Sequence, residues 1–255
     1  MEDLRAGSRL ELLARRWGLL DPPFAYSRRW VSRLFLHGPD VRTLDLGCGE
    51  GYFTLAAARL GGYALGISND PRALRRATGV RDLMGVPAER AEFRNADLRT
   101  WRPGPGEQYD QILLLSVLEH VQDDAGLLRR AHSALKPDGL LFVSAPNRAC
   151  GLREKRPHVI REETGGHLRH GYTFEQLEAL LACCGYEAVD RRGLGWLGTQ
   201  TLAQLERSLA FSRLARAAGR VLLFPLAKPM AGLLDLMPVG EPYLVLITAR
   251  KAESA

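Results

Sequence analysis

The sequence predicts an α/β fold with a doubly wound, mostly parallel sheet, and three observations support this class. Short apolar runs with strand character alternate with helical patterns along the chain. The stretch LDLGCGEGYF at residues 44–53 is a glycine-rich loop that joins an apolar run to a helical pattern. The run YDQILLL at residues 109–115 is continuously apolar after Gln111, as expected of a strand that helices cover on both faces.

The expected elements follow one another in the order that such a fold requires. We expect seven strands, at residues 41–46, 63–67, 91–95, 109–115, 140–145, 187–191 and 243–249. We expect helices at residues 53–60, from Pro71 onward, from the caps Asp123 and Asp124 to Leu135, and from Thr173 to Cys184. The last of these helices begins with the spacing of a capping box, and Lys136–Gly139 has the composition of a turn before the fifth strand.

Length and composition describe an ordinary globular protein. The chain has 255 residues, of which 46% are hydrophobic and 25% charged, which is enough for one full core. The N-terminal stretch MEDLRAGSRLELLARR carries charges throughout, and no apolar run reaches about 18 residues. We therefore expect neither a signal peptide nor a membrane span, and a cytoplasmic location.

Cysteine spacing and charge argue against a structural metal and against a nucleic acid. The four cysteines lack the spacing of a metal site or of a disulfide framework, so we expect free thiols and no metal; they are Cys48, Cys150, Cys183 and Cys184. A net charge of +6 would suit nucleic acid or an anionic membrane surface. Nearly all the cations are arginines spread along the chain, so they form no footprint, and we do not expect a nucleic-acid partner.

The glycine-rich loop predicts a cofactor site. In doubly wound sheets a ligand binds outside the carboxyl ends of the strands, and glycines there permit a tight turn and a close approach of the backbone. Dinucleotide sites use the spacing GxGxxG, whereas this loop reads GxGxG and follows Asp45. A carboxylate at that place repels a phosphate and attracts a cationic amine, which argues against NAD. A purely structural tight turn is the alternative.

Four stretches in order make the sequence similar to the class I methyltransferases that use S-adenosylmethionine. They are the acid and glycines Asp45, Gly47, Gly49 and Gly51, then Asn95–Leu98, then Tyr109–Val121, and then the turn Leu135–Gly139. The resemblance covers about residues 41–192 and the last strand, and within the superfamily it is to the small-molecule branch, similar to methyltransferase types 11 and 12. It implies a seven-stranded Rossmann-like methyltransferase sheet with helices on both faces. It also implies an N-terminal helical cap at 1–40 before a core at 41–250, and the length before the last strand indicates a helical insert at about 196–240.

The resemblance also implies which residues hold S-adenosylmethionine. In the family, the acid after the third strand meets the adenine amino group, and here that acid is Asp97. The implied set is Asp45, Gly47, Cys48, Gly49, Gly51, Ser68, Asn69, Asp97, Leu98, Ser116 and Tyr26. The chain departs from the family at Ser68, where an Asp or Glu usually takes both ribose hydroxyls. Either Asn69 or Asp70 substitutes for that acid, or the ribose is held less firmly; Asp70 could equally be the N-cap of the helix at Pro71.

Methyl transfer is an in-line displacement, so the protein mainly has to align donor and acceptor and exclude water. A base near a hydroxyl acceptor helps, and histidine is the usual choice. The candidates are His120, after the fourth strand, and His158, His167 and His170, in the polar loop 148–172. The segment 165–172 resembles the part that many small-molecule methyltransferases place over the acceptor. A structural role for His120 and plain surface positions for the others are the alternatives.

The insert before the last strand exceeds what the core needs. Leucines alternate with Arg207, Arg213, Arg216 and Arg220, and the apolar stretch that follows is interrupted by Pro225 and Pro229, which we expect to break it. Packing on the sheet edge, a lid over an apolar acceptor, a dimer surface and peripheral contact with anionic lipid through residues 200–238 are the open alternatives.

These observations favour a methyltransferase that acts on a small or lipid-like acceptor, with oxygen as the expected atom. One alternative is a tRNA or rRNA base methyltransferase. The DPPF tetrapeptide that nucleobase enzymes carry after the fourth strand occurs here at 21–24, before the glycine loop, so we interpret it as a turn. The other alternative is a non-catalytic protein that binds S-adenosylmethionine.

Overall fold

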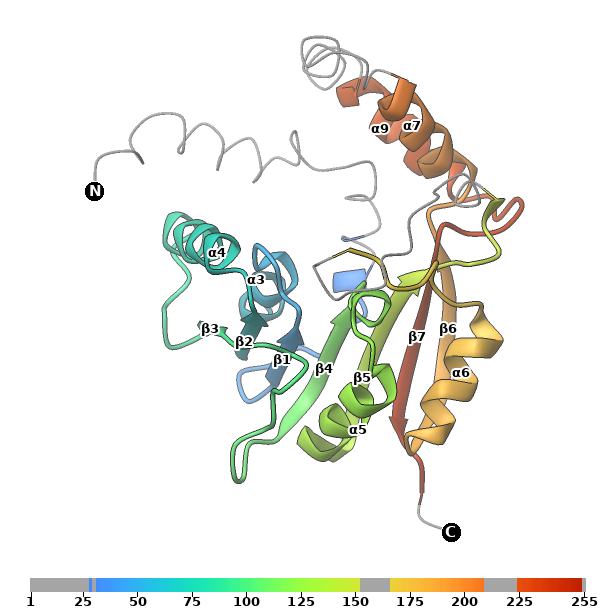
Figure 1. Ribbon diagram of the computed structural model, residues 1–255. Helices are drawn as coiled ribbons and strands as arrows, with labels where there is room; N and C mark the ends of the chain where they lie inside the picture. Colours follow the sequence, from blue (N-terminus) through green and yellow to red (C-terminus); the bar gives the residue numbers. More distant parts are fainter. Residues whose placement is uncertain (1–27, 29–30, 152–165, 209–223, 254–255) are drawn as a thin grey trace. The chain divides into compact units, whose positions relative to one another are not determined.

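The computed structural model describes residues 28, 31–151, 166–208 and 224–253 (Figure 1). The chain divides into two compact units. One consists of residues 32–192 and 244–255 and contains the glycine loop; the other consists of residues 1–31 and 193–243.

A seven-stranded sheet forms the first unit and extends into the start of the second along β6. Its strands are β1 (Arg42–Leu46), β2 (Tyr63–Ser68), β3 (Ala91–Asn95), β4 (Tyr109–Leu115), β5 (Leu135–Pro146), β6 (Tyr186–Leu194) and β7 (Leu244–Lys251). They lie in the order β3-β2-β1-β4-β5-β7-β6. The pairings from β3 to β5 are parallel, whereas β5 and β7 are antiparallel. The predicted doubly wound α/β class, with its mostly parallel sheet, is confirmed.

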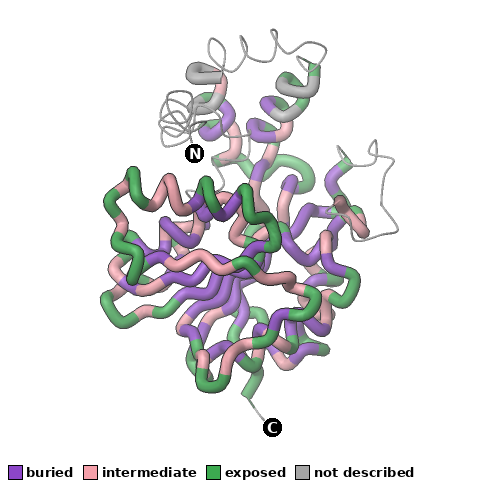
Figure 2. The backbone as a smooth tube through the Cα atoms, turned by 60° about the vertical axis from the view of Figure 1, so that its left-hand side comes forward, coloured by how far each residue is buried: buried purple, intermediate pink, exposed green. Residues whose placement is uncertain are grey.

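Helices cover both faces of this sheet. They are α3 (Tyr52–Arg59), α4 (Pro71–Leu83), α5 (Asp124–Ala134) and α6 (Phe174–Cys183), with a short 3-10 helix, η1 (Leu118–His120). From β1 the chain winds outward through β2 to β3, and from β4 it winds the opposite way, so right-handed crossovers put α3 and α4 on one face and α5 and α6 on the other. The central strands between the helix layers are largely buried, as the purple stretches of the backbone in Figure 2 show; Leu44, Leu65 and Ile112 are fully buried examples.

The predicted helix starts are confirmed in their chemistry. Asp70 accepts hydrogen bonds from the backbone of Arg72 and Ala73, so it is the N-cap of α4. Asp123 caps α5 by accepting from Gly126. Thr173 and Gln176 form the complete capping box of α6.

The prediction that residues 136–139 form a turn before the fifth strand was wrong. β5 already begins at Leu135, which pairs with Tyr109, and the next pair is Leu140 with Gln111. The residues Lys136–Gly139 are therefore a bulge within one strand. The reason is that Lys136 donates to Asp110 at 2.7 Å, which ties the bulge to β4 and lets pairing continue on both sides of it.

In the second unit two helices pack on each other, α7 (Leu197–Ser208) and α9 (Phe224–Leu234). A Cβ at Gly198 would lie 2.0 Å from the carbonyl oxygen of Ala231, so this glycine permits the close approach. The expectation that Pro225 and Pro229 break the apolar stretch was wrong, because α9 runs through both. Pro225 lies in the first turn, where an N–H has no intrahelical acceptor, and Pro229 forgoes only one bond. Among the helices described, none has the length and apolar character needed to cross a membrane.

Candidate functional site

The loop between β1 and α3 has a backbone that only glycine adopts easily. Gly47, Gly49 and Gly51 have φ angles of 83°, 53° and 76°. A Cβ at Gly47 would lie 2.5 Å from Cγ2 of Val117, and one at Gly51 would lie 2.6 Å from the ring of Phe93. A Cβ at Gly49 would meet nothing within 4 Å, so the space beside this residue is open. Two of the glycines are needed for packing, and the third faces space that a ligand can fill.

Asp45 ends β1 beneath this loop and is almost fully buried, at 2% exposure. Its Oδ2 accepts a hydrogen bond of 2.6 Å from Oγ1 of Thr54 in α3. Burial raises the pKa of the carboxyl to about 6, and the hydrogen bonds from Thr54 offset only part of that effect. Among the described residues no cation lies beside this buried carboxylate, which makes its ionised form costly, so a cationic group would be bound strongly here. Sequence reasoning found Asp45 and missed Thr54, whose position one helical turn into α3 carries no distinctive pattern.

Cys48 and Gly66 pack beside the Asp45–Thr54 pair. Burial and the neighbouring Asp45 raise the pKa of the Cys48 thiol far above its usual range, so the thiol is neutral and unreactive. A Cβ at Gly66 would lie 2.7 Å from Oγ1 of Thr54 and 2.9 Å from Sγ of Cys48. The glycine in β2 therefore makes room for the hydroxyl that supports Asp45. All four cysteines are free, as expected.

The second strand ends without an acid that points toward the loop. Ser68 is buried, and its Oγ accepts from the backbone N–H of Asp70 at 3.2 Å. Asn69 is exposed, and the carboxylate of Asp70 is engaged as the cap of α4, with its pKa lowered chiefly by the backbone N–H of Ala73. Of the two suggested substitutes for the missing acid, Asn69 is thus the one whose side chain has no capping role.

Asp97 follows β3, and its carboxylate is held by Arg99. Nε of Arg99 donates to Oδ2 of Asp97 at 2.8 Å, and its backbone N–H donates to Oδ1 at 2.9 Å. The side-chain hydrogen bond from Arg99 lowers the pKa of Asp97, so this carboxylate is ionised. The next carbonyl, that of Leu98, accepts from Nη2 of Arg130 at 3.0 Å, which fixes the loop to α5.

Ser116 follows β4 and has a φ of 57°. Among the described residues it is the only non-glycine residue with a positive φ. Its side chain is exposed, and its backbone N–H donates to Ser144 of β5 at 2.9 Å. A left-handed backbone in a residue other than glycine is strained, and such strain is concentrated at functional sites.

Two of the predicted histidines come together beside a buried acid. His120 ends η1, and its ring lies edge to face with that of His167, with centroids 4.6 Å apart. Nδ1 of His120 lies 2.9 Å from the carbonyl oxygen of Gly166, which can only accept, so in the neutral ring Nδ1 is the donor and Nε2 the acceptor nitrogen. Glu119, which sequence reasoning missed, is 1% exposed, and its ligand atom and those of both histidines lie within 4.8 Å of one another.

This cluster can bind a divalent cation or transfer a proton. Two imidazoles and one carboxylate are a common ligand set for zinc and other transition metals. The expectation that the protein binds no metal was based on the spacing of the cysteines and did not consider a site made of histidines and a glutamate. His170 lies exposed in the same segment. Tyr26 and His158 lie outside the residues that the structure describes.

Comparison with known proteins identifies the family. The family described as "Methyltransferase domain" matches residues 21–191. A ubiquinone biosynthesis O-methyltransferase of Azorhizobium caulinodans is 35% identical over 160 residues, which make up 60% of this chain and 62% of that protein. A protein of the same name from Xanthomonas euvesicatoria is 35% identical over 144 residues, or 53% of this chain and 58% of that one. The chain thus spans about two fifths to three fifths of the length of the curated relatives it matches.

Solved structures share the fold. A methyltransferase from Mesorhizobium loti that depends on S-adenosylmethionine aligns with a TM-score of 0.59 at 22% identity, over 92% of this chain and 100% of that one. The cyclase SpnF aligns with a TM-score of 0.62 at 23% identity, over 90% of this chain and 82% of that one. At these identities the likeness concerns the fold alone. Because the family match extends over more than half of the sequence, the chain belongs to the methyltransferase-domain family.

Proposed function

We propose that this protein transfers the methyl group of S-adenosylmethionine to a hydroxyl oxygen of a small or lipid-like acceptor. The observation that carries the proposal is the pairing of His120 with His167 beside Glu119, directly after β4. That position is at the carboxyl end of the strand next to β1, whose own carboxyl end leads into the glycine loop. A proton acceptor therefore lies at the sheet edge where doubly wound folds bind their ligands. The names of the curated relatives, O-methyltransferases of ubiquinone biosynthesis, support oxygen as the atom.

The methyl donor is held by groups from four strand ends. Asp45 pairs with the cationic amine of S-adenosylmethionine, and the open side of Gly49 lets the backbone approach it. Asp97 and the backbone after β3 receive the adenine, with Leu98 beside it. Ser68 and Asn69 hold the ribose through single hydrogen bonds in place of a bidentate carboxylate. Cys48 and Gly51 shape the loop, and Ser116 lines the edge at β4.

The histidine pair then acts on the acceptor. Nε2 of His120 or a ring nitrogen of His167 takes the hydroxyl proton as the oxygen attacks the methyl carbon, and the methyl–sulfur bond breaks to leave S-adenosylhomocysteine. His170 lies on the same segment and is the weaker candidate because it is exposed. If Glu119, His120 and His167 held a cation instead, the cluster would supply Lewis-acid chemistry that lowers the pKa of a bound hydroxyl. Activity that survives a chelator favours the direct base, and activity that zinc or magnesium restores after chelation favours the cation.

The α7–α9 unit carries an exposed apolar surface of its own. The end of α9 and the residues after it expose Met230, Leu233, Leu236, Met237 and Val239, each by more than half. Such a surface suits an apolar acceptor tail, a peripheral contact with lipid through residues 200–238, or a second copy of the chain as a homodimer. Sedimentation with anionic vesicles and light scattering of the free protein separate the last two.

The test is turnover on a defined panel of acceptors. The panel contains phenols and aliphatic alcohols, each with and without a long apolar tail, together with bulk tRNA, and mass spectrometry detects the gain of one methyl group. Transfer to a hydroxyl supports the proposal. Transfer to tRNA alone supports the nucleobase alternative. Binding of S-adenosylhomocysteine with no transfer to any acceptor supports the non-catalytic alternative. The cyclase SpnF has the same fold, which is consistent with functions other than methyl transfer on this fold.

A further inference from the structure

Residues 166–172, which we call the strap, lie along the carboxyl ends of β4 and β5. The backbone N–H of Leu168 donates to the carbonyl of Glu119 at 2.8 Å, and that of Tyr172 donates to the carbonyl of Pro146 at 2.9 Å. Gly171 has a φ of 109°, and a Cβ there would lie 1.9 Å from the Pro146 carbonyl oxygen. The strap is thus attached at both strand ends, by the contact between Nδ1 of His120 and the carbonyl of Gly166 as well as by these hydrogen bonds, and His167 lies in a stretch without helix or strand.

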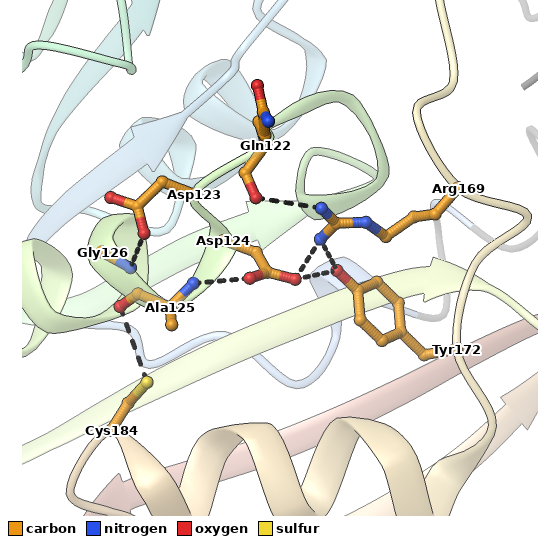
Figure 3. A network of polar contacts seen from close by, with 8 residues as sticks. All are labelled: Gln122, Asp123, Asp124, Ala125, Gly126, Arg169, Tyr172 and Cys184. Carbon is orange, nitrogen blue, oxygen red and sulfur yellow. Dashed lines mark hydrogen bonds and ion pairs between the residues drawn. The ribbon is translucent and has the colours of Figure 1, made fainter. Parts of the chain in front are cut away.

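A network of side chains fastens the same segment to the start of α5 (Figure 3). Arg169 donates through Nη1 to the carboxylate of Asp124 and to the hydroxyl of Tyr172, the latter at 2.6 Å. Its Nη2 donates to the carbonyl of Gln122 at 3.0 Å. The Tyr172 hydroxyl donates to Oδ2 of Asp124 at 2.6 Å, and Oδ1 accepts from the backbone of Ala125 at 2.7 Å. One guanidinium therefore joins three oxygen atoms, and the carboxylate it meets is held by the first turn of a helix.

Burial distinguishes this network from the surface ion pairs of the chain. The side chains of Arg169 and Asp124 are 27% and 20% exposed, and Tyr172 is buried. In contrast, the side chains of Arg250 and Glu187 are 48% and 53% exposed. An exposed pair of that kind contributes little, whereas a partly buried, fork-like contact fixes geometry. Arg169 lies two residues after His167 in the strap.

We propose that Arg169 is a positioning residue. Through Asp124 and Tyr172 it holds the strap so that His167 lies against His120 and faces the acceptor. This inference rests on the proposed function where it concerns catalysis, because it assigns to Arg169 the alignment of the base. Its structural part, that Arg169 holds the strap in place, does not depend on which acceptor the protein uses.

The kinetic test compares Arg169→Gln, Arg169→Lys, His167→Gln and the double variant Arg169→Gln/His167→Gln, with Arg250→Gln as the matched control. We expect Arg169→Gln to lower kcat by about 30-fold to 100-fold, since small displacements of a reacting group have effects of that size. Arg169→Lys does not restore the rate, because an ammonium lacks the fork. The affinity for S-adenosylhomocysteine stays within about twofold, and so does kcat of Arg250→Gln.

The double variant separates positioning from general support of the fold. If Arg169 acts through His167, its loss in the His167→Gln background costs no more than about a further twofold. Losses that multiply in the double variant would overturn the proposal, as would an Arg169→Gln variant as active as Arg250→Gln.

Hydrogen exchange tests the fastening without any acceptor. We expect the amides of Leu168 and Tyr172 to exchange at least about tenfold faster in Arg169→Gln than in the unaltered protein, with β1 and β4 unchanged. If the unaltered protein methylates no acceptor, the proposed function fails while this readout still decides the structural part. Unchanged exchange at both amides would overturn it.

Discussion

Replacing Asp45 by Asn should stabilise the free protein while it removes cofactor binding. The pKa of this buried carboxyl is about 6, against an ordinary value of 3.8. At about 1.4 kcal/mol per pKa unit, the folded state loses about 3 kcal/mol by keeping Asp45 ionised at pH 8. Asn has the same shape, carries no charge and can keep the hydrogen bond with Thr54. The expected gain in the free energy of unfolding is therefore up to about 3 kcal/mol at pH 8.

The sign of the pH dependence follows from the direction of the pKa shift. Because the folded-state pKa of Asp45 lies above the unfolded one, the carboxyl does not destabilise the fold below about pH 4; its cost grows from there to about pH 6 and is nearly constant above that. The advantage of Asp45→Asn should thus shrink from pH 8 to pH 4.

Urea unfolding followed by circular dichroism at pH 8, 6 and 4 measures this difference. Asp110→Asn is the matched control, since backbone and Lys136 contacts hold the pKa of Asp110 below its usual range, and its removal should destabilise the protein at pH 8. An Asp45→Asn variant no more stable than the unaltered protein at pH 8, or equally favoured at pH 4, would refute the reasoning.

Three further predictions concern the loop and a helix cap. Binding of S-adenosylhomocysteine should weaken about tenfold per pH unit below pH 6, as Asp45 becomes protonated and loses its attraction for the amine; calorimetry that finds constant affinity from pH 5 to 7.5 would contradict this. Gly47→Ala should destabilise the fold by about 1–3 kcal/mol through backbone strain and the clash with Val117. Gly49→Ala should lower the free energy of unfolding by only about 1 kcal/mol but should abolish cofactor binding. Unfolding and binding measurements on both variants compare the two effects. Thr173→Ala should remove the capping box of α6 and cost about 1 kcal/mol in urea unfolding; a loss below a few tenths would contradict the assigned cap.

The parts of the fold that follow local chemistry could be predicted from the sequence. Asp123 and Thr173 were predicted as caps, and Asp70 was left open as a cap or a ribose contact, because a cap depends on residues only two or three positions away. Pro229 misled the prediction, since tertiary packing of α9 can outweigh one missing hydrogen bond.

The candidate site divides in the same way. Asp45 and the three glycines follow a contiguous pattern, so they could be found from the sequence. The contact of Arg169 with Asp124 joins residues 45 positions apart, and the burial of Glu119 depends on the assembled sheet. Neither leaves a local pattern, so only the structure supplies them.

The central claim, that the loop after β1 holds S-adenosylmethionine, is tested most directly by calorimetric titration with S-adenosylhomocysteine, with NAD as the control ligand. The same titration of Asp45→Asn shows whether this carboxylate receives the amine. We predict micromolar binding of S-adenosylhomocysteine to the unaltered protein, none to Asp45→Asn, and no binding of NAD to either. Binding of NAD, or an Asp45→Asn variant with unchanged affinity for S-adenosylhomocysteine, would contradict the account.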